Sequence, residues 1–184
     1  MRTLVVTENV TLDGVMDMSG GWFDPLDTEV DQSDLAAATA EHSAAADALL
    51  VGRNTFEAFR GFWPQQTDDP TGVSDYLNRV QKYVVSRTLG EPEWANSTVL
   101  RGPLVQEVQA LKQAPGKDIV ATGSTRLVHG LIEAGLVDEY RLFVFPVVAG
   151  RGARLFEGAE GALRLLETRP FRSGAVLLRY APAK

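Results

Sequence analysis

The chain contains no cysteine, and this absence excludes disulfides, thiol nucleophiles and cysteine-ligated metals together. Its two histidines, His42 and His129, have no metal-ligand partner at a useful spacing, so we expect no metal site. No G-x-S-x-G motif occurs either, which leaves covalent hydrolase chemistry without support. Any chemistry must therefore rest on carboxylates, arginines, hydroxyl groups and the backbone.

Positive charge is also scarce. The chain has 18 Lys and Arg residues against 24 Asp and Glu residues, a formal net charge of −6. Nucleic acid requires a clustered basic face, so this balance argues against a nucleic-acid partner. An anionic small molecule remains compatible with it, because single arginines and helix N-termini bind phosphate locally.

Long apolar segments are missing as well. No apolar run approaches the ~20 residues of a membrane span. The opening M-R-T-L-V-V-T is too short and soon too polar for a signal peptide, so we expect a cytoplasmic protein with no membrane partner. At 184 residues, of which 45% are apolar, the chain suits one domain with a sizeable core.

Apolar β-branched stretches alternate with helix-forming stretches through most of the chain, and strands alone follow. We expect strands at 4–10, 48–51, 82–86, 97–100, 118–122 and 137–148, and helices at 35–48, 53–59, 74–80, 103–115 and up to Gly135. The last two strands, near 163–168 and 175–180, flank Arg172-Ser173-Gly174, which is typical of a hairpin. This order predicts an α/β fold: a mixed, mostly parallel central sheet with helices on both faces and a C-terminal antiparallel hairpin.

Three expected strands end in residues suited to phosphate. Glycine permits close backbone approach, a helix N-terminus offers free N–H groups, and arginine offers a bidentate fork. The three ends carry Gly52-Arg53-Asn54-Thr55, Ser86-Arg87-Thr88 and Gly123-Ser124-Thr125. Singly, each is explained as well by a turn or a solvated arginine. Together they predict a rim for a dinucleotide, because open α/β sheets bind ligands beyond the carboxyl ends of their strands. The missing G-x-G-x-x-G after the first strand disfavours a standard Rossmann domain.

These motifs, in this order, resemble the dihydrofolate reductase-like superfamily. The resemblance rests on T-L-D-G at 11–14, V-G-R-N-T-F-E at 51–57, K-Y-V-V-S-R-T-L at 82–89, G-S at 123–124, G-L-V-D-E-Y at 135–140 and P-V-V-A-G-R-G at 146–152. The most similar branch is the C-terminal reductase domain of the bifunctional riboflavin-synthesis enzyme, with its stand-alone bacterial relatives. Nearly the whole chain is covered, so residues 1–184 are expected to form a single reductase domain.

The resemblance implies an NADPH-dependent oxidoreductase that transfers a hydride to a small heterocycle. By it, Gly52, Arg53 and Thr55 form the cofactor-binding turn, Ser86 and Arg87 bind the adenosine 2′-phosphate, and Gly123, Ser124 and Thr125 hold the pyrophosphate. The relatives also suggest a homodimer, in which the apolar stretch 142–145 is either core or subunit interface. The alternative from another class is a non-catalytic NADPH-binding protein that retains the fold.

The W-F-D-P-L-D stretch at 22–27 resembles the W-x-x-P-x-D segment of true dihydrofolate reductases, where the acidic residue supports proton transfer. Asp27 is then the candidate catalytic carboxyl, since burial beside a substrate ring would raise its pKa toward neutrality. Asp24 competes for the same role and is otherwise a candidate substrate-binding residue. Asp27 is equally a candidate N-terminal cap of the Ala-rich helix.

Asp13 is the second candidate catalytic residue, and it also has two interpretations. It either turns toward substrate at the end of the first strand or caps a turn with Gly14. Trp22 and Trp63 are candidates to wall a flat substrate by stacking, or else pack down as lids.

Two substrates follow from the resemblance: a dihydropterin, or the riboflavin-pathway pyrimidine 5-amino-6-(5-phosphoribosylamino)uracil. The Trp22, Pro25 and Asp27 pattern favours the pterin. The segment 13–34 contains no Lys or Arg, which counts against a phosphorylated substrate.

Overall fold

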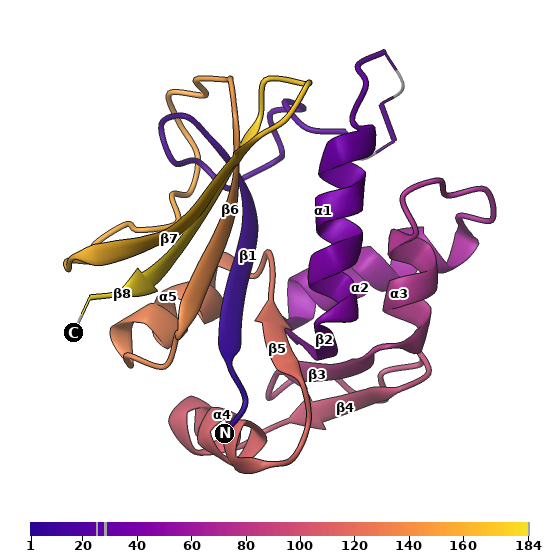
Figure 1. The fold of residues 1–184 in the computed structure, drawn as a ribbon. Helices are drawn as coiled ribbons and strands as arrows, with labels where there is room; N and C mark the ends of the chain where they lie inside the picture. Colours follow the sequence, from indigo (N-terminus) through magenta and orange to yellow (C-terminus); the bar gives the residue numbers. More distant parts are fainter. Residues whose placement is uncertain (25, 28, 184) are drawn as a thin grey trace.

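The computed structural model describes residues 1–24, 26–27 and 29–183. Its strands are β1 (Leu4–Thr11), β2 (Ala46–Gly52), β3 (Gln81–Val85), β4 (Ser97–Leu100), β5 (Asp118–Ala121), β6 (Glu139–Phe145), β7 (Leu163–Pro170) and β8 (Val176–Pro182). They form one sheet in the order β4-β3-β2-β5-β1-β6-β8-β7 (Figure 1).

The sheet is parallel from β4 to β6 and antiparallel from β6 to β7. β7 and β8 form the expected hairpin, whose turn is closed by a hydrogen bond of 2.9 Å from the N–H of Phe171 to the carbonyl of Ala175. The predicted fold class is confirmed.

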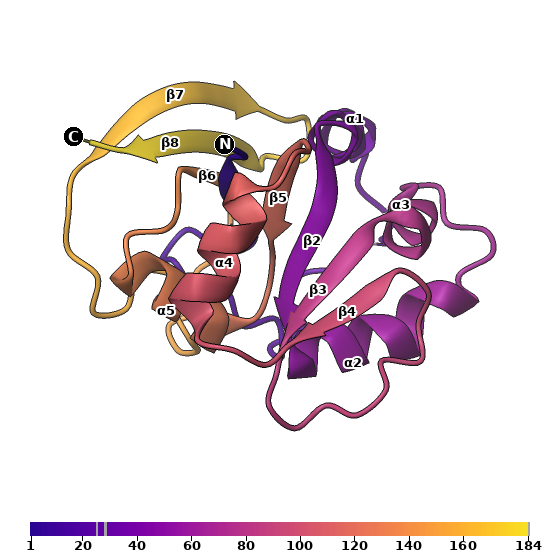
Figure 2. The same ribbon diagram turned by 90° about the horizontal axis from the view of Figure 1, so that it is seen from below.

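Helices cover both faces of the sheet. They are α1 (Ser33–Ala44), α2 (Arg53–Phe62), α3 (Val73–Arg79), α4 (Leu104–Gln113) and α5 (Thr125–Glu133), with a 3₁₀ turn, η1, at Trp63–Gln65. The connections from β1 to β3 run across the sheet in one direction and those from β4 to β6 in the other. Right-handed crossovers therefore place α1–α3 on one face and α4 and α5 on the other. Figure 2 shows α4 and α5 beside each other, across the sheet from α1 and α3.

The two faces carry separate cores. On β1, Leu4, Val6 and Val10 belong to the cluster that includes α5, whereas Val5 belongs to the cluster that includes Phe56 of α2. This is the two-residue alternation of a strand buried on both sides. The even-numbered residues of β1 therefore face α5, which matters for the site described below.

Three expected boundaries were wrong by three residues or more, one of them the end of α2, which lies at Phe62 instead of 59. The Ala-rich helix ends at Ala44 instead of 48, because Ala46 and Ala48 pair with β5 and sheet pairing overrides alanine's helix propensity. β6 ends at Phe145, before Pro146, which has no N–H to continue a ladder. Within the 142–145 stretch, Leu142 and Phe143 are core residues, only 6% and 3% exposed.

Candidate functional site

Two strand-end turns interlock at the carboxyl edge of the sheet. β2 and β5 are neighbours, so the turn at Gly52 meets the turn at Gly123. The N–H of Gly52 donates to Ser124 Oγ at 2.8 Å, and the N–H of Ser124 donates to Thr55 Oγ1 at 2.9 Å. The sequence prediction that these residues share one rim is met, with Thr55 and Ser124 joining the turns to each other.

Gly123 is required by this geometry. Its φ is +57°, and an added Cβ would lie 3.0 Å from Thr55 Cγ2. In the described part of the chain, no acceptor is found for the backbone N–H groups of Thr125, Arg126 and Leu127. These three amides, at the positive end of the α5 dipole, form a cradle suited to a phosphate.

The Ser86 turn lies beside the start of α2. Arg53 Nη1 donates to Thr88 Oγ1 at 2.9 Å, and its Nε donates to Glu57 Oε1 at 3.0 Å. Ser86 Oγ accepts the N–H groups of Thr88 and Leu89, at 3.2 and 2.9 Å. The hydroxyl of Ser86 thus already shapes the turn, so its remaining capacity toward a ligand is as a donor.

Sequence reasoning missed Arg101, which directly follows β4. Its Nη2 donates to the carbonyl of Leu89 at 2.6 Å, and its Nη1 donates to the carbonyl of Arg87 at 3.3 Å. With Arg53 and the exposed Arg87, it surrounds one short turn with three guanidinium groups. The signal was present in the sequence, since an arginine beyond a strand end is the pattern that identified Arg53.

Asp13 fastens two loops together. Its carboxylate accepts the Thr11 hydroxyl at 2.6 Å and the N–H groups of Ala149 and Gly150 at 3.1 and 2.8 Å. These hydrogen bonds, with that from Thr11 the largest effect, lower its pKa to about 2. An aspartate held ionised in this way is poorly suited to donate a proton. Its role is structural, but the carboxylate binds Thr11 and the 149–150 segment and does not cap the turn at Gly14, whose N–H bonds the Thr11 carbonyl.

Asp27 is neither buried nor the N-terminal cap of α1. The side chain is exposed, and Oδ1 accepts the N–H of Glu29 at 2.8 Å. Helix α1 begins at Ser33 with Gln32 at its N-cap, so Asp27 does not cap it. Asp24 is also exposed, and its Oδ1 accepts the N–H of Leu26 at 2.9 Å. These aspartates bond their own backbone two residues on, a local turn that replaces the expected burial and helix capping. Pro25, part of the same motif, lies outside the described residues.

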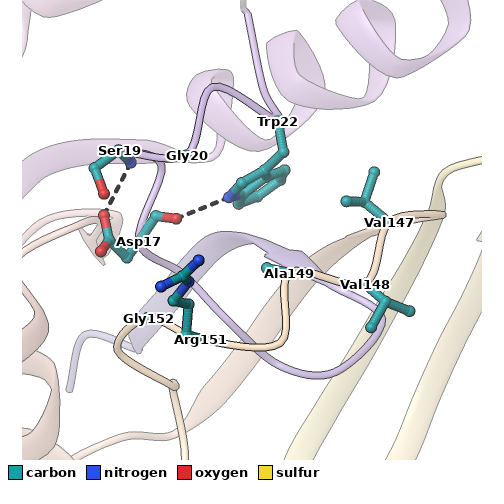
Figure 3. A pocket seen from close by; sticks show the side chains of 9 residues that line it. All are labelled: Asp17, Ser19, Gly20, Trp22, Val147, Val148, Ala149, Arg151 and Gly152. Carbon is teal, nitrogen blue, oxygen red and sulfur yellow. Dashed lines mark hydrogen bonds between the residues drawn. The ribbon is translucent and has the colours of Figure 1, made fainter.

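A cavity of about 450 Å³ opens between the early loop and the segment after β6. Its lining comprises Asp17, Ser19, Gly20, Trp22, Val147, Val148, Ala149, Arg151 and Gly152 (Figure 3). Trp22 Nε1 donates to the carbonyl of Asp17 at 2.8 Å, and its ring lies 5.7 Å from that of Phe145. Trp22 therefore presents an indole at the cavity, as expected of a residue that walls a flat substrate.

Trp63 does not share this position. It is 7% exposed and packs in the core on the α2–α3 side, edge-on to Phe62 at 5.0 Å. Of its two interpretations, packing is correct.

The strand order places the cavity, at the ends of β1 and β6, next to the phosphate cradle at the end of β5.

In residues 1–24, 26–27 and 29–183, no group of three or more His, Asp or Glu side chains is arranged to hold a metal ion. No helix there has the length and apolar character needed to cross a membrane.

The model of the RibD C-terminal domain family matches residues 2–177. The chain belongs to this family. A similar protein is the uncharacterized protein YyaP of Bacillus subtilis (strain 168). It is 32% identical over 185 residues, which cover 97% of this chain and 94% of YyaP. The resemblance inferred from the motifs is thus confirmed.

Solved structures show the same fold. A putative riboflavin biosynthesis protein from Shewanella sp. PV-4 superposes with a TM-score of 0.72 at 21% identity, covering 99% of both chains. Dihydrofolate reductase from Enterococcus faecalis, complexed with NADP(H) and RAB-propyl, gives 0.67 at 17% identity, covering 99% of this chain and 97% of that one. This member of the RibD C-terminal domain family therefore has a dihydrofolate reductase-like, reductase-type fold.

Proposed function

We propose that the protein is an NADPH-dependent reductase that transfers a hydride to a small heterocyclic substrate. The observation that carries the proposal is the cradle at the start of α5. There, three amides that have no acceptor among the described residues follow Gly123, where an added Cβ would crowd Thr55. Such a site suits a pyrophosphate, which needs both free N–H groups and a close backbone approach.

The residues present fit NADPH along the whole rim. Gly52, Thr55, Gly123, Ser124 and Thr125 would hold the pyrophosphate. The neighbouring turn, with Ser86, Arg87, Arg53 and Arg101, would hold a 2′-phosphate through charge-assisted hydrogen bonds. The bound cofactor supplies the hydride, and the chain's own residues bind and orient it.

The substrate would occupy the cavity beside Trp22. Among the described residues, its lining has one cationic side chain, Arg151, and one carboxylate, Asp17. Arg172 is paired with Asp31 and Asp34, and Arg154 with Asp13, so these two cations are already neutralised by carboxylates of the segment 13–34. This charge balance favours an uncharged, pterin-like heterocycle over a phosphorylated pyrimidine. Because Asp27 is exposed, its proposed part in proton transfer would run through water.

Turnover is the test of this proposal. Purified protein with NADPH should oxidise the nicotinamide in the presence of dihydrofolate or the aminouracil intermediate, and not in their absence. NADPH binding without turnover on either would favour the non-catalytic alternative. The observation favouring that alternative is that Asp13 is fastened by backbone amides and Asp27 is exposed.

We further propose a homodimer formed through the free edge of β7. Leu163, Leu165 and Leu166 are 38%, 51% and 40% exposed there, on the last strand of the sheet. An edge strand with apolar side chains and unpaired backbone groups is suited to pair with a second copy.

A further inference from the structure

Glu8 is a carboxyl group buried in an apolar face. It lies on β1 between Val6 and Val10, on the side covered by α5, and is 2% exposed. Its Oε1 has no hydrogen-bond partner among the described residues. A buried carboxylate is costly unless it is paired, whereas the neutral acid is tolerated much better. Nothing in the fold of β1 requires a polar side chain at this position.

Glu8 lies directly beneath the proposed phosphate cradle. β1 and β5 run parallel with Val6 opposite Ala121, so two residues further on Glu8 is level with Gly123. The backbone N–H of Gly123 lies close enough to the Glu8 carboxyl group to lower its pKa. Gly123 stands immediately before Ser124 and the first turn of α5. The carboxyl group therefore contacts the cradle from the core side, opposite the side open to a ligand.

None of the described residues that pack around Glu8 provides a compensating charge. On β6, Leu142 is its direct neighbour, and Tyr140 is the titratable side chain on the same face. On α5 the buried residues are Leu127, Val128 and Leu131, while Arg126 is exposed and His129 Nε2 lies 2.8 Å from the Arg154 carbonyl. Two of the buried cations, Arg2 and Lys112, lie at the other end of β1, about 20 Å away at the rise of a strand. The buried Arg141 of β6 lies opposite Thr7, on the other face of the sheet from Glu8.

Burial therefore raises the pKa of Glu8 well above its ordinary value, and the nearby N–H of Gly123 offsets this only in part.

We propose that Glu8 is a positioning residue that must be protonated for a dinucleotide to bind at the first turn of α5, so that cofactor affinity depends on pH through this group. The proposal rests on the proposed function, since the ligand is the pyrophosphate of the cofactor. An ionised Glu8 would place a negative charge under the same amides that bind the phosphates, separated from them by protein of low dielectric constant. The neutral acid leaves the full positive potential of the helix end to the ligand.

The linkage has a definite sign. Bound phosphate raises the pKa of Glu8 further, so binding above the pKa of the free protein takes up one proton from solvent onto the carboxyl group. Affinity is then constant at low pH and falls as pH rises through the pKa of the free protein, by at most about tenfold per pH unit.

The experiment is a titration of NADPH and of NADH, followed by cofactor fluorescence, from about pH 5 to about pH 9. NADH lacks the 2′-phosphate, so its pH profile is free of that group's own ionisation. Glu8→Gln is neutral and similar in shape, and its amide oxygen can still face the Gly123 N–H. Glu133→Gln, exposed at the other end of α5, is the matched control.

We expect the affinity of the unmodified protein for NADH to fall about tenfold or more across this range, and that of Glu133→Gln to fall equally. The NADH affinity of Glu8→Gln should change less than about twofold. Parallel profiles for Glu8→Gln and the unmodified protein would overturn the role of Glu8, as would a flat profile in the unmodified protein. Absence of cofactor binding at every pH would overturn the proposed function and this proposal together.

A second readout needs no variant. The ¹³C resonance of the Glu8 carboxyl carbon should titrate above the ordinary glutamate range in the free protein, and the saturating cofactor should move this titration upward. An unchanged midpoint with bound cofactor would also overturn the coupling.

Discussion

Gly52 and Ser124 are 72 residues apart in the chain and are joined by a hydrogen bond of 2.8 Å from the backbone N–H of one to the side-chain oxygen of the other. This bond locks the β2–α2 turn against the β5–α5 turn. The two halves of the proposed phosphate site therefore hold a fixed relation before any ligand arrives, which lowers the ordering cost of binding.

Ser124→Ala tests this lock. It removes the acceptor for the Gly52 N–H, a net loss of about 1 kcal/mol for a hydrogen bond. We expect NADPH affinity to fall about fivefold to tenfold, measured by isothermal titration calorimetry. Ser97→Ala, whose hydroxyl makes only a 3.5 Å contact to Ala95, is the matched control. Equal NADPH affinity in Ser124→Ala and Ser97→Ala would mean that the hydrogen bond between the two turns does not contribute to cofactor binding.

Arg101→Ala tests the residue that sequence reasoning missed. It removes the guanidinium that braces the Arg87 and Leu89 carbonyls. We expect NADPH affinity to fall about tenfold or more while NADH affinity stays within about twofold, since a charge-assisted bond to phosphate contributes about 1.5–3 kcal/mol. Arg164→Ala, an exposed arginine on β7, should leave both affinities unchanged. An equal loss of affinity for NADPH and NADH would mean that Arg101 does not bind the 2′-phosphate.

Asp13→Asn tests the hydrogen bonds by which Asp13 joins the loop after β1 to the segment 149–150. The folded pKa of Asp13, about 2, lies below its ordinary value of 3.8, so the stability it confers is present above about pH 4 and is lost as pH falls toward 2. The variant should melt at a lower temperature near neutral pH, and the difference from the unmodified protein should shrink between pH 4 and pH 2. Thermal unfolding followed by circular dichroism measures this. A pH-independent difference would mean that the carboxylate charge is not what holds Ala149 and Gly150.

Leu165→Lys tests the proposed dimer. A charge on the exposed apolar edge of β7 should halve the mass found by light scattering at micromolar concentration, with secondary structure intact. Leu12→Lys, at a 68% exposed leucine beyond the end of β1, is the control and should keep the dimer mass. A monomer mass for the unmodified protein would contradict the proposed homodimer.

Much of the fold follows from sequence because local patterns and topology agree. The alternation of strands and helices, with Gly-rich turns at strand ends, was enough to bring Gly52 and Gly123 to one rim. The end of α1 was misplaced because Ala46 and Ala48 have helix propensity and their strand conformation depends on pairing with β5, a contact remote in sequence.

The carboxylates were harder to predict. Asp27 and Asp24 sit in turns that each builds with its own backbone, which no motif distinguishes from a cap or a catalytic position. Glu8 went unnoticed although its signal was plain: a single acidic residue at a core-facing position of the first strand. Its neighbour Gly123 comes from β5, more than a hundred residues later, so only the sheet order shows what Glu8 is near.

The most direct measurement is a comparison of NADPH and NADH binding to the unmodified protein and to Arg53→Ala, by cofactor fluorescence and thermal shift near pH 6. We expect the unmodified protein to be stabilised by NADPH more than by NADH, and Arg53→Ala to lose this preference while still binding NADH. No stabilisation of the unmodified protein by saturating NADPH would contradict the reductase assignment.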